Sequence, residues 1–513
     1  MPLAPDNTAS RSVVRTTPNL GLGLVLLAAA LLRFSAIGAH LPFSPGVDEP
    51  EVMERAVRMM KTGDLNPHFF DYPSLYIYVE AVASTLRFLR GAMQGRWAAL
   101  ALAPTEEFYL WGRAVTAIFG IATVWLMYRV GLYWGRRTAL LAAVMLAVMP
   151  MHVRESHYTL TDVPSTFFAT LTLLLSLRAH ERATLWRFVF AGAAAGLAGA
   201  TKYNAGLAII IPLLACVLTP SVRPSRSVAL AWIGLGTFVG FLFAAPYTLL
   251  DLPHFLNGFA YLASEYRAPL SGDPVWLREI KSLRIALGWP GGIVVFGALA
   301  LGAVRIVVGP DRVKWVLATI FPLLYFFFVS RQNLFFARYM LPMVPFLSLL
   351  GAAGVVWIAD AARRTIAPRP VRQAVIAALT LITIVPPAYA SLQFVAQESR
   401  VWTTEQAYHW ILHRLPKGTP IRFEGSVTIR LPPDYKASYV KQLGHQDLDA
   451  YREDGIQYLV ASSQVFGKFF EDPAGYPEEN RQYRRLFEHT EEVARFTGTD
   501  EHPGPELRIL RVK

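Results

Sequence analysis

Long stretches without a charged side chain constrain this fold more than any other feature of the sequence. A helix crosses a bilayer with about 20 mostly apolar residues, or with somewhat fewer when flanking charges reach the headgroups. The longer runs without Asp, Glu, Lys or Arg are 16–32, 203–222, 227–250, 285–304, 339–359 and 373–397, and the shorter ones are 114–128, 138–153, 163–177, 188–201 and 315–330. These eleven runs predict a mainly α fold, a polytopic membrane helix bundle.

The composition agrees with a membrane protein. Of the 513 residues, 53% are hydrophobic and 17% charged, against roughly 25% charged in an average soluble domain, which excludes a single soluble globule. The one cysteine, Cys216, excludes an intrachain disulfide and a four-cysteine metal site. Residues 1–392 contain 33 Lys and Arg against 19 Asp and Glu, whereas residues 393–513 contain 16 against 18. The basic excess therefore belongs to the membrane part, and without a nucleic-acid-binding motif it predicts no nucleic acid partner.

The loops predict an orientation. Lys and Arg gather at 135–137, 178–187, 223–226, 305–314 and 363–372. Since basic loops stay in the cytoplasm, the opposite, outer face receives residues 39–73, 154–162, 251–284, 331–338 and the tail from 393. Residues 74–111 either cross twice, with Arg87, Arg90 and Arg96 at a cytoplasmic turn, or lie at the interface as a helix. We therefore expect 13 or 11 transmembrane helices in a multi-pass protein of the plasma (inner) membrane.

The tail looks like a separate domain. Residues 455–460 have the composition of a strand after a turn glycine, and residues 404–415 have an amphipathic helical pattern. The sequence predicts two domains, with a membrane domain at 1–392 and a small extracytoplasmic α/β domain at 393–513.

Two adjacent carboxylates, Asp48 and Glu49, stand in the first outer segment, just before a helical stretch from Glu51 to Lys61. Acidic residues cap helix N-termini and interact well with the helix dipole, so capping is one interpretation. The other is a general base, because a partly desolvated carboxylate at the membrane boundary can accept a proton from a bound hydroxyl group.

A second outer acid, Asp162, begins the run 163–177 and again suits a helix cap. Arg154 and His157 lie close before it. Ionisable groups crowded at one membrane depth usually face protein or a water-filled cavity. These residues therefore form a candidate substrate pocket on the same side as Asp48.

The third outer cluster is cationic. Arg331 and Arg338 lie in a loop where the charge rule disfavours them, and Lys202 is the lone charge between two apolar runs. Guanidinium groups bind phosphate with two hydrogen bonds, so these cations predict a phosphorylated ligand. The alternative is an ordinary salt bridge or contact with the headgroups of membrane lipids.

Several common motifs are missing from the sequence. It contains no P-loop, no dinucleotide-binding glycine pattern and no His-Glu-x-x-His zinc motif in the required context. Chemistry driven by a soluble nucleotide is therefore not expected. An enzyme at the outer face would need a donor delivered through the membrane as a lipid phosphate.

The order of several short motifs resembles a known family. They are Asp48-Glu49, Asp71-Tyr72-Pro73-Ser74-Leu75, Gly112-Arg113, the stretch from Gly135 to Ala143 that leads to Pro150 and Asp162, Thr201-Lys202-Tyr203, and Ala337-Arg338-Tyr339-Met340-Leu341-Pro342. Their succession over about residues 20–360 resembles the GT-C class of integral-membrane glycosyltransferases, in particular the protein O-mannosyltransferase and aminoarabinose transferase group. That group uses polyprenyl-phosphate sugars.

The resemblance implies an inverting glycosyltransferase that moves a sugar from a polyprenyl-phosphate donor to a hydroxyl acceptor in a lipid, glycan or protein. The implied roles are Asp48 as base, with Glu49 as its substitute and Asp162 as a supporting acid; Lys202, Arg331, Arg338 and Tyr339 on the donor phosphate; and Tyr72, Arg154 and His157 in the substrate pocket. A divalent metal ion held by Asp48, Glu49 and Asp162 is an alternative. No other cofactor is expected.

Two rival functions use the same charges. A membrane transporter or flippase would use them for a polar or lipid-linked substrate. A glycan ligase or polymerase would take its glycan from a lipid diphosphate.

Overall fold

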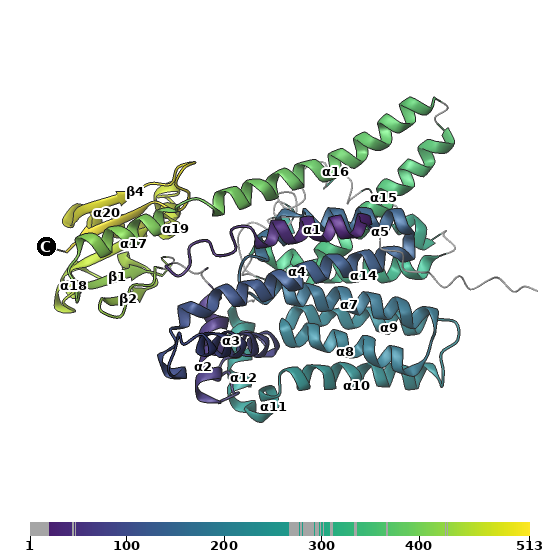
Figure 1. Cartoon of the computed structure of the whole chain (residues 1–513), viewed down its shortest axis with the longest axis horizontal. Helices are drawn as coiled ribbons and strands as arrows, with labels where there is room; N and C mark the ends of the chain where they lie inside the picture. Colours follow the sequence, from purple (N-terminus) through teal and green to yellow (C-terminus); the bar gives the residue numbers. More distant parts are fainter. Residues whose placement is uncertain are drawn as a thin grey trace, which may run out of the picture.

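The computed structural model describes residues 20–43, 46, 48–265, 311–332, 336–365, 368–425, 427 and 429–512, with scattered positions between 276 and 307. Most helices run along the long axis of the molecule, and a small sheet domain lies at one end (Figure 1). We call this end of the bundle the domain end.

The first half of the bundle runs from α1 to α10. The helices are α1 Leu20–Phe34, α2 Glu49–Thr62, α3 Leu75–Met93, α4 Tyr109–Gly131, α5 Arg136–Ala147, α6 Pro150–Glu155, α7 Asp162–Glu181, α8 Leu185–Thr201, α9 Ile210–Leu218 and α10 Arg226–Ala244. Short 3-10 helices are η1 Leu100–Leu102, η2 Thr105–Phe108, η3 Leu132–Trp134 and η4 Tyr203–Ile209.

The second half contains α11 Tyr247–Leu250, α12 Leu252–Glu265, α14 Arg312–Val329, η5 Ala337–Met343, α15 Val344–Thr365 and α16 Arg369–Glu398. Five helical segments of the described chain are long and apolar enough to cross a membrane: 105–134, 226–244, 312–329, 337–365 and 369–414. Shorter apolar helices cover 20–34, 185–201 and 203–218. The run 285–304 lies mostly outside the described residues. The chain is a multi-pass membrane protein by this pattern, without a settled number of spans.

Glycines allow α8 and α10 to pack closely. A Cβ atom at Gly236 of α10 would lie 2.6 Å from the carbonyl oxygen of Val189, and one at Gly240 would lie 2.6 Å from that of Ala193. The two glycines are four residues apart and therefore share one face of the helix. Small residues at this spacing let membrane helices approach to backbone contact.

The segment 74–111 stays at the domain end. Arg87, Arg90 and Arg96 line a cavity together with Tyr408 and Arg430 of the sheet domain. The alternative that places these arginines at a turn on the side opposite the sheet domain is therefore wrong. The rule that basic loops stay in the cytoplasm fails here because a nearby carboxylate, Glu107, offsets the positive charge. Arg87 and Arg96 each lie 3.1 Å from Glu107.

The sheet domain has five strands in the order β2-β1-β3-β5-β4. Its elements are α17 Thr403–Arg414, β1 Pro420–Glu424, β2 Lys436–Val440, η6 Leu443–His445, α18 Leu448–Glu453, β3 Tyr458–Ser462, α19 Ser463–Glu471, α20 Pro477–His489, β4 Glu491–Phe496 and β5 Leu507–Arg511. β1 pairs in parallel with β2 and β3, and β5 pairs antiparallel with β3 and β4. The small C-terminal sheet expected from the sequence is present, and α16 continues six residues past the expected boundary at 392.

The sheet domain contacts the bundle through the loop after α1. The Arg430 amide donates to the Phe43 carbonyl oxygen at 2.7 Å, and the Arg430 side chain pairs with Glu54 of α2 at 3.0 Å. Glu398, at the end of α16, lies 3.2 Å from His40. These contacts bring the domain close to the start of α2.

Candidate functional site

The carboxylate of Asp48 faces an arginine. Asp48 is the N-cap residue of α2, but its side chain makes no capping hydrogen bond. It pairs instead with the guanidinium group of Arg338 in η5. Capping alone therefore does not explain this acid. Its side chain is 27% exposed, so it remains accessible to a ligand.

Arg338 also approaches a second acid. Its Nε atom lies 3.8 Å from Asp162, and Asp162 accepts a 2.6 Å hydrogen bond from the Lys202 ammonium group. Lys202 in turn lies 4.4 Å from the centre of the Tyr339 ring. Asp48, Arg338, Asp162 and Lys202 thus form a continuous row of alternating charges, which we call the charge row. α2, α7, η5 and the turn after α8 each supply one member.

Glu49 has a different environment from its neighbour. Its side chain is fully buried and accepts two hydrogen bonds from Arg113 of α4, at 2.8 and 2.7 Å. It also accepts hydrogen bonds from the backbone amides of Gly46 and Thr159. All of its acceptor capacity is directed at the protein itself, so this carboxylate fixes the start of α2 and adjoining loops.

The metal alternative needs three ligands at one point. Among the described residues, no group of three or more His, Cys, Asp or Glu side chains could hold a metal ion. Asp48 and Asp162 share an arginine, and Glu49 pairs with another. The donor set at this position therefore does not fit a divalent cation.

Arg154 and His157 lie beside the charge row rather than in it. Arg154 pairs with Glu155 at 2.6 Å. Both ring nitrogens of His157 lie 2.9 Å from backbone carbonyl oxygens, one of Val153 and one of Ser35. His157 thus connects the turn after α6 to the segment after α1, whereas the Arg154 ion pair stays within α6.

A cavity of about 490 Å³ opens beside Lys202. Tyr72, Lys202 and Tyr339 line its polar part. Its other walls come from η4, α12 and α14 and are mainly apolar: Leu207, Ile209, Phe259, Leu262, Ala263 and Phe328. Such a cavity suits an amphiphile whose charged end meets Lys202 while its chain leaves along the apolar walls.

Arg331 lies away from the charge row. Its guanidinium group sits 4.2 Å from the ring centre of Phe327 and lines a neighbouring hollow of about 500 Å³. This hollow shares Leu207, Phe328 and Gln332 with the cavity beside Lys202. Arg331 therefore lies beside that cavity and not in its lining.

Two acids near the site have no role that the sequence predicts. Asp71 lines the cavity beside Lys202, and burial, followed by the nearby Glu51 carboxylate, raises its pKa. Glu80 of α3 is fully buried, next to Gly112 of α4. The sequence does contain a signal for Glu80, because this acid is the only charged residue in the stretch 72–86.

Several solved structures have a fold similar to that of this chain. ArnT from Cupriavidus metallidurans, bound to undecaprenyl phosphate, matches with a TM-score of 0.57 and 16% identity over 96% of this chain and 97% of that chain. The chain has the fold of the GT-C glycosyltransferases. The Archaeoglobus fulgidus oligosaccharyltransferase in its apo form matches this chain with a TM-score of 0.59 and 12% identity, over 90% of this chain and 72% of that one.

Sequence comparison points in the same direction. The family model described as dolichyl-phosphate-mannose-protein mannosyltransferase matches residues 110–249. No curated protein sequence matches the chain. A third structure, the archaeal oligosaccharyltransferase AglB from Archaeoglobus fulgidus with an inhibitory peptide and a dolichol-phosphate, has a TM-score of 0.58 and 13% identity over 95% of this chain and 74% of that one. The resemblance to GT-C glycosyltransferases stated from the sequence is confirmed.

Proposed function

We propose that this GT-C chain is an inverting glycosyltransferase that moves a sugar from a polyprenyl-phosphate donor to a hydroxyl acceptor at the outer face of the membrane. The observation that carries the proposal is the charge row, whose Lys202 lines a mainly apolar cavity. A lipid phosphate fits this arrangement, because the cations Lys202 and Arg338 suit the phosphate group and the apolar cavity suits the lipid chain. Undecaprenyl phosphate and dolichol-phosphate are present in two of the matching structures.

In this proposal the donor phosphate lies between Lys202 and Arg338, near Tyr339, and the polyprenyl chain follows the apolar walls. Asp162 is buried and contacts both cations, so it holds them in place before the donor arrives. Preorganised cations stabilise the charge that develops on a leaving phosphate. A phosphate leaving group of this kind needs no general acid.

Asp48 supplies the base. In the structure its carboxylate is paired with Arg338. When a donor phosphate takes over that guanidinium group, the carboxylate becomes available to an acceptor. Asp48 then accepts the hydroxyl proton while the acceptor oxygen forms a bond to the anomeric carbon. The bond between this carbon and the phosphate oxygen breaks on the opposite side, which inverts the configuration.

The test uses purified protein and a radiolabelled polyprenyl-monophosphate sugar. Positioned proton transfer typically contributes 10²–10⁴-fold to a rate, so Asp48→Asn should reduce transfer or donor hydrolysis by about that factor while it still binds the donor. Asp64→Asn is the matched control, because Asp64 is a loop acid outside the charge row. Near-normal turnover by Asp48→Asn would show that Asp48 is not the general base.

A companion variant separates binding from chemistry. Arg338→Ala should weaken donor binding about tenfold or more, because a charge-assisted hydrogen bond is lost. An unchanged donor affinity would remove Arg338 from the phosphate site. Turnover of a lipid-diphosphate glycan in place of the monophosphate sugar would indicate a ligase or polymerase. Movement of an intact lipid-linked substrate without hydrolysis or transfer would indicate a flippase.

A further inference from the structure

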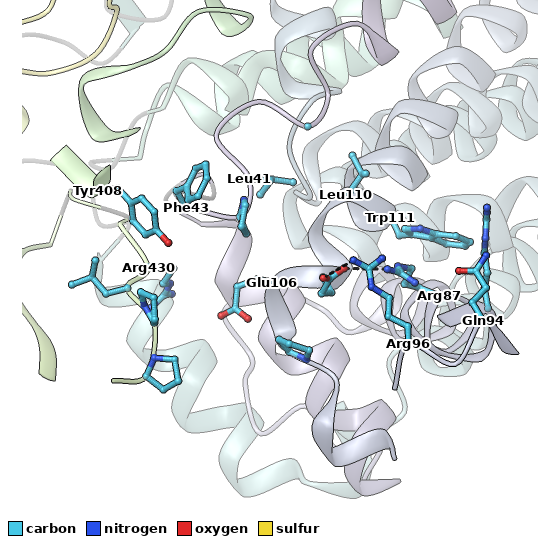
Figure 2. Close-up of a pocket in the computed structure, with 18 residues that line it drawn as sticks. Leu41, Phe43, Arg87, Gln94, Arg96, Glu106, Leu110, Trp111, Tyr408 and Arg430 are labelled. Atoms are coloured by element: carbon cyan, nitrogen blue, oxygen red, sulfur yellow. Dashed lines mark hydrogen bonds and ion pairs between the residues drawn. The ribbon is translucent and has the colours of Figure 1, made fainter. Parts of the chain in front are cut away.

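A second, larger cavity lies between the bundle and the sheet domain. Its volume is about 760 Å³, and none of its lining residues lines the cavity beside Lys202. In Figure 2, Tyr408, Arg430 and Phe43 stand on one side, and Trp111, Gln94, Arg87 and Arg96 stand on the other. The cavity is therefore a separate site, shared by both parts of the chain.

The lining has more positive than negative charge. Four arginines and two glutamates line it, a net charge of +2. Glu107 pairs with both Arg87 and Arg96, so one carboxylate offsets two cations. Arg430 pairs with Glu54.

The remaining arginine, Arg90, has no carboxylate within ion-pairing distance in the described part of the chain, and its guanidinium group lies 5.9 Å from the Trp111 ring centre. An exposed arginine without a carboxylate partner can make two hydrogen bonds to a phosphate group. Gln94, one turn further along the chain, offers an amide donor in the same lining.

An apolar surface leads to these charges. α3 exposes Val82, Leu86, Leu89 and Met93, whose spacing places them along one side of the helix. Leu110 of α4 is exposed and lines the cavity itself. An amphipathic helix with a cationic end and an exposed apolar stripe is typical of a membrane interface. The ligand that matches has a phosphate group and hydrocarbon chains.

We propose that this cavity binds the phosphate-bearing headgroup of one anionic membrane phospholipid, with Arg90 on the phosphate and the acyl chains along the exposed side of α3. The lipid contacts the bundle through Arg90 and Trp111 and the sheet domain through Arg430. It is not the sugar donor, since the donor cavity lies elsewhere, and the site does not depend on the proposed reaction.

Trp111 provides a local readout for the test. Bromine atoms on lipid chains quench tryptophan fluorescence on contact, so the full chain in phosphatidylcholine-based detergent micelles is titrated with phosphatidylglycerol brominated on its acyl chains. The chain has 12 tryptophans. The quenching that disappears in Trp111→Phe is therefore assigned to this site, and every variant is measured both with Trp111 present and in combination with Trp111→Phe.

We expect saturable quenching of Trp111 by brominated phosphatidylglycerol and an apparent affinity about tenfold weaker in Arg90→Gln. Arg90→Lys should recover part of the affinity. Arg400→Gln is the matched control, because Arg400 is also exposed at the domain end but lies outside the cavity. Arg90 is exposed, so its replacement should leave the unfolding temperature unchanged.

Three results would overturn the proposal. Equal quenching by brominated phosphatidylcholine would remove the preference for negative charge. Equal affinity in wild type and Arg90→Gln would remove the arginine from the headgroup. Displacement of the lipid by glycerol phosphate at the same concentration would show a site for a soluble phosphate, since it would mean that the acyl chains add nothing.

Discussion

The buried pair of Glu49 and Arg113 leads to a prediction about stability. Glu49→Gln should destabilise the protein when Arg113 is present and stabilise it when Arg113 is replaced. Arg113 donates two hydrogen bonds to Glu49 and two more, at 3.0 and 2.8 Å, to the carbonyl oxygens of Ile37 and Ala39. Arg113→Met leaves the Glu49 carboxylate buried without a counter-ion. Removing one partner of a buried pair costs about 3–5 kcal/mol. An unfolding entropy of about 2.1 cal/mol/K per residue gives about 1 °C per kcal/mol for a chain of this length, so the unfolding temperature should fall by about 3–5 °C.

The second substitution tests the cause. In the wild-type background, Glu49→Gln leaves Arg113 unpaired and should also lower the unfolding temperature. In the Arg113→Met background, the same change removes an uncompensated buried charge and should raise it, because a neutral amide is less costly to bury than a carboxylate. The four proteins form a double-mutant cycle. The measurement is thermal unfolding in detergent, followed by tryptophan fluorescence.

Arg129→Met is the control, because Arg129 lies in the last turn of the same helix and has a cation–π contact rather than an ion pair in the described residues. It should shift the unfolding temperature much less than Arg113→Met. If Glu49→Gln is destabilising by the same amount in both backgrounds, the two side chains are not coupled. The role of Glu49 as a structural residue would then be wrong, and its role as a second base would have to be considered again.

Two further predictions concern helix packing and pH. Gly236→Ala places a Cβ atom 2.6 Å from the Val189 carbonyl oxygen and should destabilise the protein by about 1–3 kcal/mol through overpacking. Gly234→Ala is the control and should be close to neutral, because a Cβ atom there would have no atom within 4 Å. Equal unfolding temperatures of the two variants would show that α8 and α10 do not need this close contact. Asp71 has a raised pKa, so the cavity loses a negative charge as the pH falls through that pKa. The affinity for the polyprenyl-phosphate sugar should therefore rise by about two- to fivefold, equivalent to ~0.5–1 kcal/mol, and Asp71→Asn should show the higher affinity throughout; an identical pH profile in both proteins would refute this.

The sequence could place charges on one side of the bundle more readily than it could predict their partners. The alternation of apolar runs and basic loops along the chain places Asp48, Asp162 and Arg338 on one face. The same alternation places Lys202 there. That reasoning fixes the depth of a residue but not the direction of its side chain.

Glu49 shows that the direction of a side chain does not follow from the sequence pattern. It is adjacent to Asp48 in the sequence, but successive residues at the start of a helix point about 100° apart. One carboxylate therefore meets Arg338, and the next enters the interior to meet Arg113. The partner of each acid is a distant residue, which local pattern does not specify.

The arginines of α3 show a different limit. Arg87, Arg90 and Arg96 suggested a cytoplasmic turn because a charge rule treats Lys and Arg as unpaired. Glu107, which offsets Arg87 and Arg96, follows only after a turn of the chain. In the sheet domain, strand composition after a turn glycine predicted β3 to within a few residues, since such signals are local.

The length of α16 has a consequence for how the sheet domain can vary. This helix has 30 residues and would be about 45 Å long at 1.5 Å per residue, and it ends at Glu398, which faces His40. Inserting a single residue near its end would rotate everything beyond it by about 100°, so that Glu398 would point away from its partner and the domain would present another face to α2. Seven added residues, close to two full turns, would restore the angle and lift the domain by about 10 Å. The effect of an insertion in this helix therefore depends on how many helical turns it adds. The rotation at the end of α16 determines which face of the sheet domain meets the membrane part.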